Sequence, residues 1–164
     1  MGEVNVRIAT EADWPGIWLI VEAVVRAGET YTWPTDLSEP DARRLWMVAP
    51  PGLNLVAVHG ATMLGSAKIT PNQMGPGAHV ANGSFMVGPT ARGRGVGRLL
   101  GHAALDHARR AGFRAMQFNA VVEVNVTAVN LWRSLGFDIL ATVPEAFDHP
   151  SQGRVGLHIM HRRL

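Results

Sequence analysis

The chain has 164 residues, a length that suits one domain with its own hydrophobic core. Hydrophobic residues make up 47% of it and charged residues 17%, a balance that excludes a disordered chain. The formal net charge of +2 does not call for a nucleic-acid partner, and it would suit an anionic cofactor.

Alternating apolar and polar residues over 4–9 predict a first strand. Thr10 is then expected to cap a helix that ends at Gly28, because a hydroxyl followed by acidic residues favours a helix N-terminus. Residues 17–21 of this helix are apolar all round, which predicts deep burial or, alternatively, a dimer face. The helix is too short and too interrupted to span a bilayer, so we expect no membrane partner.

A loop rich in aromatic residues follows, and Ser38 is expected to cap a second, short helix. This helix ends at Pro50. Two strands, over residues 53–58 and 63–70, flank the dipeptide His59-Gly60, which indicates a hairpin. The first half of the chain therefore contributes antiparallel strands.

Strands and helices alternate in the second half. The expected elements are a strand at 80–87, a helix at 96–111, a strand at 115–121, a helix at 125–135, and strands at 137–143 and 155–161. Together with the hairpin, this order predicts a single α/β domain over residues 1–164, with a mixed central β-sheet flanked by helices.

A glycine-rich segment joins the strand at 80–87 to the following helix. Its glycines alternate at Gly93, Gly95 and Gly97, so the main chain can approach a ligand closely. The helix that follows presents free N–H groups and the positive end of its dipole. Arg92, Arg94 and Arg98 add permanent positive charge. The segment therefore predicts a pyrophosphate cradle.

Other interpretations of this segment fit less well. It lacks the Gly-Lys-Ser/Thr ending of a P-loop, and its spacing differs from the Rossmann G-x-G-x-x-G pattern. An RNA-binding tract rich in Arg and Gly would be longer and disordered, whereas this segment opens an amphipathic helix. A merely structural turn is the remaining alternative.

The segment resembles the GCN5-related N-acetyltransferase (GNAT) superfamily. Its first signature, V-x-P followed by R/Q-x-x-G-x-G/A, matches Val87-Gly88-Pro89 and Arg92-Gly93-Arg94-Gly95-Val96-Gly97. A second signature, N-x-x-A-x-x-L-Y-x-x-x-G-F, matches Asn125, Ala128, Leu131, Trp132, Gly136 and Phe137, with Trp132 in the place of the tyrosine. The two signatures occur in the family's order and at its separation.

The resemblance implies an acetyl-CoA-dependent N-acetyltransferase with a GNAT-like fold, in which an amine attacks the thioester directly within a ternary complex. Main-chain groups of Phe85, Met86 and Val87 would hold the pantetheine arm, and an N–H there would stabilise the oxyanion. The pyrophosphate would meet the N–H groups of residues 93–98. Asn125 would bind the cofactor or cap its helix, and these two roles are compatible.

Trp132 occupies the position from which the family's tyrosine protonates the departing thiolate. An indole N–H can donate a hydrogen bond but is not a usable acid. Tyr31 is the only tyrosine, and it lies in a loop distant in sequence. The thiolate would then leave unprotonated or take a proton from water.

The acceptor side is indicated by asparagines. Period-two alternation places Asn82 on one face of its strand, and Gln117 and Asn119 on one face of theirs. If these strands are neighbours, Asn82 and Asn119 converge; structural hydrogen bonding is the alternative. The segments 81–87 and 118–125 also resemble the yeast-type acetyltransferases of azetidine-2-carboxylate and proline analogues, which implies that both asparagines orient a small amino acid.

The sequence offers several candidates for the general base. The candidates are Glu29, Glu123 and His79. A water relay and an amine that arrives already deprotonated are the further alternatives. The histidines show no metal-ligand spacing, so no metal is expected. There is no cysteine, which excludes a thiol nucleophile and is compatible with the cytoplasm. We expect a small-molecule amine as substrate and a homodimer as the assembly, with a peptide acetyltransferase or a non-catalytic acyl-CoA sensor as alternatives.

Overall fold

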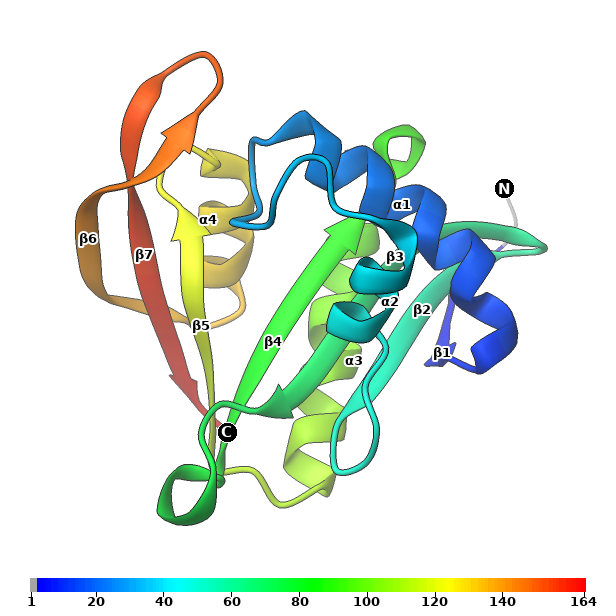
Figure 1. Ribbon diagram of the computed structural model, residues 1–164. Coiled ribbons are helices and arrows are strands. Elements are labelled where there is room, and N and C mark those ends of the chain that lie inside the picture. Colours follow the sequence, from blue (N-terminus) through cyan, green and yellow to red (C-terminus); the bar gives the residue numbers. More distant parts are fainter. Residues whose placement is uncertain (1–2) are drawn as a thin grey trace.

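One seven-stranded sheet, in the order β1-β2-β3-β4-β5-β7-β6, organises the chain (Figure 1). The computed structural model describes residues 3–164. The strands are β1 (Asn5–Ile8), β2 (Leu53–His59), β3 (Thr62–Pro71), β4 (Val80–Val87), β5 (Ala115–Val122), β6 (Asp138–His149) and β7 (Gly153–Arg163). The helices are α1 (Trp14–Ala27), α2 (Glu39–Trp46), α3 (Val96–Arg110) and α4 (Val126–Ser134). Three single-turn 3-10 segments lie at Glu11–Asp13, Gly75–Gly77 and Pro89–Ala91.

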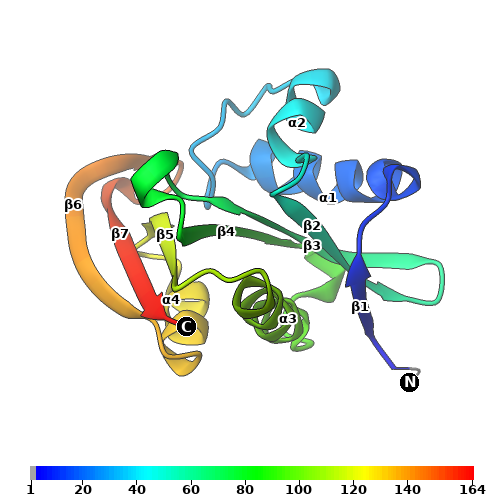
Figure 2. The same ribbon diagram turned by 90° about the horizontal axis from the view of Figure 1, so that it is seen from below.

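The sheet is mixed, as the sequence predicted. Every strand pair is antiparallel except β4 with β5, whose connection through α3 makes a parallel crossover. Helices α1 and α2 cover one face of the sheet, and α3 and α4 cover the other (Figure 2). The expected α/β fold with a mixed central sheet flanked by helices is confirmed.

Each face of the sheet has its own core. The larger cluster lies under α3 and α4, and the second lies under α1 and α2. In α1, Ile17, Ile20 and Val21 are buried in this second cluster, whereas Leu19 is exposed. Burial within one chain therefore accounts for most of the all-round apolar stretch, so this stretch gives little support for a dimer face.

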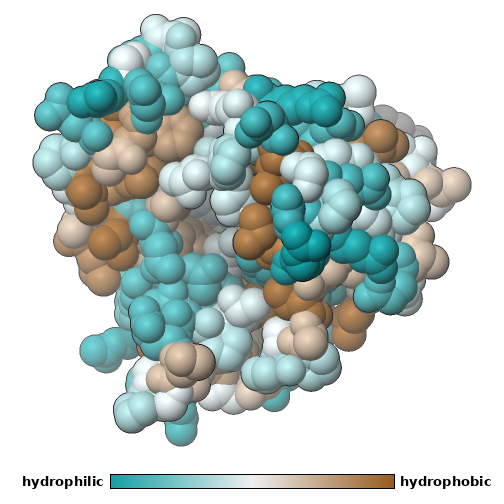
Figure 3. Space-filling view, viewed as in Figure 1, coloured by the Kyte–Doolittle hydropathy of each residue, from teal (hydrophilic) through white to brown (hydrophobic). Residues whose placement is uncertain are grey.

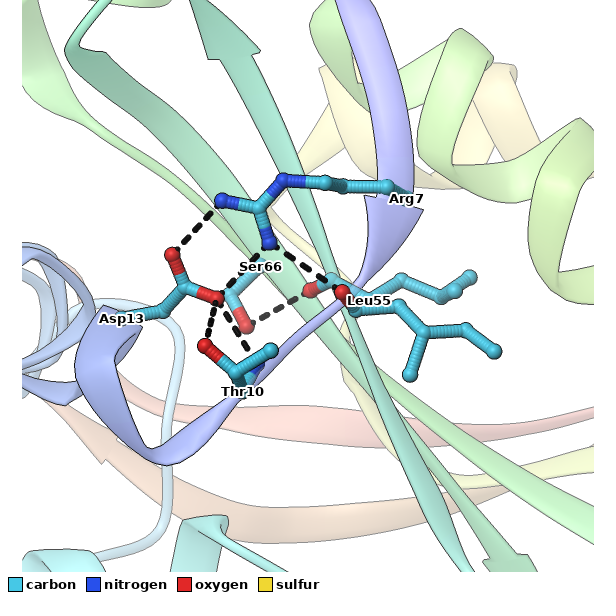
Figure 4. Close-up of polar contacts among 6 residues, drawn as sticks. Arg7, Thr10, Asp13, Leu55 and Ser66 are labelled. Carbon is cyan, nitrogen blue, oxygen red and sulfur yellow. Dashed lines mark hydrogen bonds and ion pairs between the residues drawn. The ribbon is translucent and has the colours of Figure 1, made fainter.

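The first helical turn starts after Thr10, as predicted, but this turn is not α-helical. Residues Glu11–Asp13 form a 3-10 turn, and α1 begins only at Trp14. The carboxylate of Asp13 accepts hydrogen bonds from the main-chain N–H of Thr10 (2.7 Å) and from the two terminal guanidinium nitrogens of Arg7 (2.8 Å each) (Figure 4). Asp13 therefore holds the tight turn and ties it to β1.

The last hairpin is longer than predicted. We expected a strand to end at Val143, but β6 continues through Pro144 to His149. β6 is an edge strand, so its outer side has no partner strand. Pro144 has no N–H, and on that outer side its lack removes no hydrogen bond of the sheet. The register with β7 shifts between Val143 and Phe147, and Glu145 there has a positive φ of 50°. This irregularity absorbs the extra residues.

Candidate active site

The central parallel strands separate along their length. Pairing between β4 and β5 covers only Val80–Asn82 against Ala115–Gln117. Beyond these residues the two strands diverge (Figure 1), and the surface dips between the β5–β7 side and the α1–α2 side (Figure 3). The far half of β4 therefore has a sheet neighbour on one side only.

The unpaired edge of β4 can be assigned from its hydrogen bonds. The N–H of Gly88 donates to Leu64, and the carbonyl of Val80 accepts from Asn72, so even-numbered residues of β4 face β3. Because main-chain groups alternate along a strand, those of Phe85 and Val87 face the gap that opens between β4 and β5 where these strands diverge. The main-chain groups of Met86 face β3 instead. The N–H groups of Phe85 and Val87 are thus better placed than that of Met86 to meet a ligand in the gap.

Tyr31 reaches this gap from the loop between α1 and α2. Its hydroxyl donates a hydrogen bond to the main-chain oxygen of Phe85 at 3.0 Å. Burial raises the pKa of Tyr31, and the bond to Phe85 only partly offsets this effect. The sequence placed Tyr31 in a distant loop, and the fold brings it to the centre of the candidate site.

The glycine-rich segment lies at the end of β4. Gly93 and Gly95 have φ values of 74° and 77°, a left-handed conformation that favours glycine. Gly95 is followed directly by α3, whose first N–H groups have no partner within the helix. Arg92, Arg94 and Arg98 are exposed, and none takes part in the ion pairs found within residues 3–164. This end of α3 therefore offers N–H donors and uncompensated positive charge to an anion.

Gly97 has a different task from the other two glycines. It faces α4, where a Cβ at this position would lie 3.1 Å from a methyl group of Leu131. One turn later, a Cβ at Gly101 would lie 2.6 Å from Leu135. These glycines let α3 and α4 pack closely, so part of the glycine signature is structural.

The second signature gives α4 its start and its buried face. The side chain of Asn125 accepts a hydrogen bond from the N–H of Ala128, so it caps α4. Trp132 is buried, with its ring centroid 4.6 Å from that of Phe85 and 4.7 Å from that of Phe118. Trp132 therefore supports β4 from the α3–α4 face. Cofactor contacts of Asn125 and Trp132 stay predictions.

The predicted asparagines lie on one face of the sheet and belong to a hydrogen-bonded chain. The side chain of Asn82 donates to the main-chain oxygen of Gln117 (3.2 Å), and the Gln117 side chain donates to that of Asn119 (2.9 Å). Asn119 in turn donates to the side chain of Asn72 at 2.8 Å. The sequence missed Asn72, which comes directly after β3. Only the fold brings its loop beside β5.

A cavity lies beside the gap between β4 and β5 rather than in it. It has a volume of about 690 Å³. Its walls come from the segment after α2 and from the β3–β4 connection, and they include Arg44, Thr70 and Asn72. Since Asn72 accepts from Asn119, the cavity adjoins the asparagine chain. It offers space for an acceptor next to the polar groups.

The three base candidates lie apart from one another. His79 is exposed and precedes β4 at the end opposite the glycine-rich segment. Glu29 is exposed in the α1–α2 loop. Glu123 is exposed just beyond β5, and its N–H donates to Gly156. The contacts of these side chains single out none of them as a base.

Comparisons with known proteins agree with this geometry. Residues 18–137 match the model of the acetyltransferase (GNAT) family. A GCN5-related N-acetyltransferase from Kribbella flavida is 55% identical, with 98% of each chain covered and a TM-score of 0.95. The N-acetyltransferase aca1 of Schizosaccharomyces pombe is 38% identical over 85 residues, which are 52% of this chain and 41% of that relative's length.

The yncA protein of Salmonella typhimurium, solved with its cofactor acetyl-CoA, shares the fold. It is 24% identical, with a TM-score of 0.85 over 99% of this chain and 95% of that one. The chain belongs to the acetyltransferase (GNAT) family. It is an acetyl-CoA-dependent N-acetyltransferase, and the sensor alternative is accordingly set aside. None of the helices within residues 3–164 is long and apolar enough to cross a membrane.

Proposed function

We propose that this enzyme acetylates the amine of a small molecule, in the class of amino acids and proline analogues. The observation that carries the proposal is the asparagine chain Asn82–Gln117–Asn119–Asn72, which lies where β4 and β5 separate. Amide side chains donate and accept hydrogen bonds, so they can hold both an amine and a carboxylate. The likeness of segments 81–87 and 118–125 to acetyltransferases of azetidine-2-carboxylate supports this acceptor class.

In the proposed complex, the pantetheine arm of acetyl-CoA lies in the gap and pairs with the free edge of β4 at Phe85 and Val87. The pyrophosphate binds the N–H groups from Gly93 to Arg98. Arg92, Arg94 and Arg98 add charge around the phosphates. The glycine-rich segment thus fixes one end of the cofactor, and β4 fixes the reacting end.

The amine nitrogen attacks the thioester carbon and forms a tetrahedral intermediate. Its oxyanion accepts a hydrogen bond from the N–H of Phe85 or Val87; one such donor is typically worth about 3 kcal/mol. The C–S bond then breaks, the amide remains, and the thiolate leaves with the electron pair. The proton lost by the amine passes to water or to the thiolate. This scheme needs no cysteine and no covalent enzyme intermediate.

A screen of free amines tests this proposal. The purified chain is incubated with acetyl-CoA and a panel of amino acids, proline analogues and simple amines, and thiol release and acetylated product are both measured. We expect turnover with small amino acids that exceeds thioester hydrolysis. Acetylation of peptides alone would reject the small-molecule assignment.

A peptide N-acetyltransferase is the second candidate, because the cavity beside Asn72 is large enough for a longer acceptor. A single assay that compares free amino acids with short peptides at equal concentration separates the two. The homodimer also remains a proposal. It now rests on exposed apolar residues of the edge strand β6, such as Leu140 and Val143, and light scattering tests it.

A further inference from the structure

The only lysine of the chain, Lys68, lies on the face of the sheet that carries Asn82, Gln117 and Asn119, here called the acceptor face. All other basic side chains besides histidine are arginines. In the register of β3 with β4, Lys68 is opposite Ser84, and Thr70 is opposite Asn82. Directly opposed residues in an antiparallel pair share a face. Lys68 therefore projects from the same face as the asparagine chain.

The surroundings of the Lys68 ammonium are unusual for a lysine. The side chain is half-buried, and its nitrogen lies 5.7 Å from the ring centroids of both Trp33 and Trp46. It donates one hydrogen bond, to the main-chain oxygen of Leu45 at 2.8 Å. Within residues 3–164 no carboxylate forms an ion pair with it. Burial lowers the pKa of Lys68, since the charged form loses hydration.

A half-buried cation loses part of its hydration, which costs free energy. A bound anion would offset this cost by pairing with the cation. On the same face of the sheet, Ser84 lies opposite Lys68 and Asn82 lies opposite Thr70, and the neutral side chains of Gln117 and Asn119 follow on β5.

The strand that carries Lys68 also leads into the cavity, whose wall includes the next residue on this face, Thr70. The wall also includes Asn72 and Arg44, and Arg44 is already paired with Asp41. A small acceptor that extends from this cavity along the face towards Lys68 would thus meet an ammonium without a counter-ion and several neutral hydrogen-bonding groups.

We propose that Lys68 binds the carboxylate of the acceptor and thereby selects amines that carry an acid group over neutral amines. This inference rests on the proposed small-molecule function and extends it to the residue that determines specificity. The four-carbon stem of lysine is flexible. The ammonium therefore needs only to exchange the Leu45 carbonyl for the ligand, or to share it, and the aromatic rings hold it in place.

The experiment measures acceptor binding separately from turnover. Alanine, serine and proline and their primary amides are titrated by calorimetry into the chain saturated with coenzyme A. We expect each acid to bind about 10- to 100-fold more tightly than its amide, the range for one charge-assisted hydrogen bond. Lys68→Met should remove this preference and leave amide binding unchanged. Lys68→Arg should retain part of it, because the charge remains.

Arg43→Met is the matched control. Arg43 is an exposed cation of α2 that pairs with Glu11, so its loss changes the net charge equally without touching the acceptor face. An unchanged preference in Lys68→Met, an equal loss in Arg43→Met, or no preference in the unmodified chain would each overturn the inference. If acids bind through Lys68 and are not acetylated, the inference stands and the proposed function fails. If the acids are acetylated equally well by Lys68→Met, the proposed function stands and the inference fails.

Discussion

The hydroxyl of Tyr31 and the main-chain oxygen of Phe85 are joined by a hydrogen bond of 3.0 Å. This bond connects the α1–α2 loop to the half of β4 that has no neighbour in the sheet. It also occupies a carbonyl that faces the gap in which the pantetheine arm is proposed to lie. The hydroxyl of Tyr31 therefore links the loop to the proposed cofactor-binding edge.

Tyr31→Phe removes this contact without emptying the aromatic cluster, because the ring still packs 5.3 Å from Trp33 and 6.3 Å from Trp46. We expect the free energy of unfolding to fall by about 1 kcal/mol. Thermal unfolding followed by tryptophan fluorescence measures the change. Since burial raises the pKa of Tyr31, the hydroxyl stays protonated at neutral pH, and Tyr31→Phe should not alter the shape of the pH–rate profile below about pH 9. A new or lost limb in that range would contradict this role.

Asn119→Ala removes the central link between Gln117 and Asn72. We expect kcat/KM for the acceptor to fall about 10- to 100-fold, because polar groups at the site lose their partners. The affinity for acetyl-CoA should be unchanged. Asn130→Ala, on the exposed side of α4, is the control and should have no effect on either quantity. A loss of acetyl-CoA affinity in Asn119→Ala would contradict the acceptor-binding role of this residue.

Gly95→Ala tests the glycine-rich segment. Gly95 has a φ of 77° and Gly60, in the β2–β3 hairpin, has a φ of 58°, and neither has an atom within 4 Å of an added Cβ. Alanine in this conformation costs about 1 kcal/mol, so both variants should lose similar stability. Only Gly95→Ala should also weaken acetyl-CoA binding in calorimetry. Equal affinities of Gly95→Ala and Gly60→Ala for acetyl-CoA would contradict a cofactor-binding role for the glycine-rich segment.

The pair of Arg7 and Asp13 predicts a pH-dependent contribution to stability. Hydrogen bonds from Arg7, against the opposing effect of burial, lower the pKa of Asp13 to about 2. A carboxyl whose pKa is lower in the folded state stabilises the protein above its unfolded pKa of about 4, and loses this contribution as the pH falls towards 2. Asp13→Asn should therefore lower the free energy of unfolding by about 1–2 kcal/mol at pH 7, after allowance for the partly exposed Arg7, and by much less near pH 2.

Urea unfolding at both pH values measures the Asp13 effect. Asp106→Asn is the control, because Asp106 pairs with Arg109 on the exposed surface of α3, and such pairs contribute little. A constant difference between Asp13→Asn and the unmodified chain at both pH values would refute the role assigned to Asp13.

The local parts of the site could be predicted from the sequence, and the contacts between distant segments could not. The glycine-rich segment and the Asn125 cap are predicted by patterns of residues that are close in sequence. Period-two alternation is enough to place Asn82 and Asn119 on defined strand faces. Tyr31, Lys68 and Asn72 carry no local signal. Their importance arises only when the α1–α2 loop folds over β4 and the β3–β4 connection reaches β5.

The fold shows the same division. The sheet class and most element positions follow from periodicity and from glycine and proline signals. The extension of β6 past Pro144 does not, because an isolated proline indicates a strand end unless the strand is known to lie at the edge of the sheet. The turn that precedes α1 is 3-10, and its Asp13 contacts Arg7 on another element, a contact that local patterns do not show.

Direct detection of acetyl transfer to a small amino acid tests whether this enzyme acetylates small amines. The chain is mixed with acetyl-CoA and the amino-acid panel, and products are identified by mass spectrometry alongside released coenzyme A. We expect an N-acetylated amino acid formed in equal amount to free coenzyme A, with the yield reduced in Asn119→Ala and unchanged in Asn130→Ala. Release of coenzyme A without any acetylated amino acid would contradict this expectation.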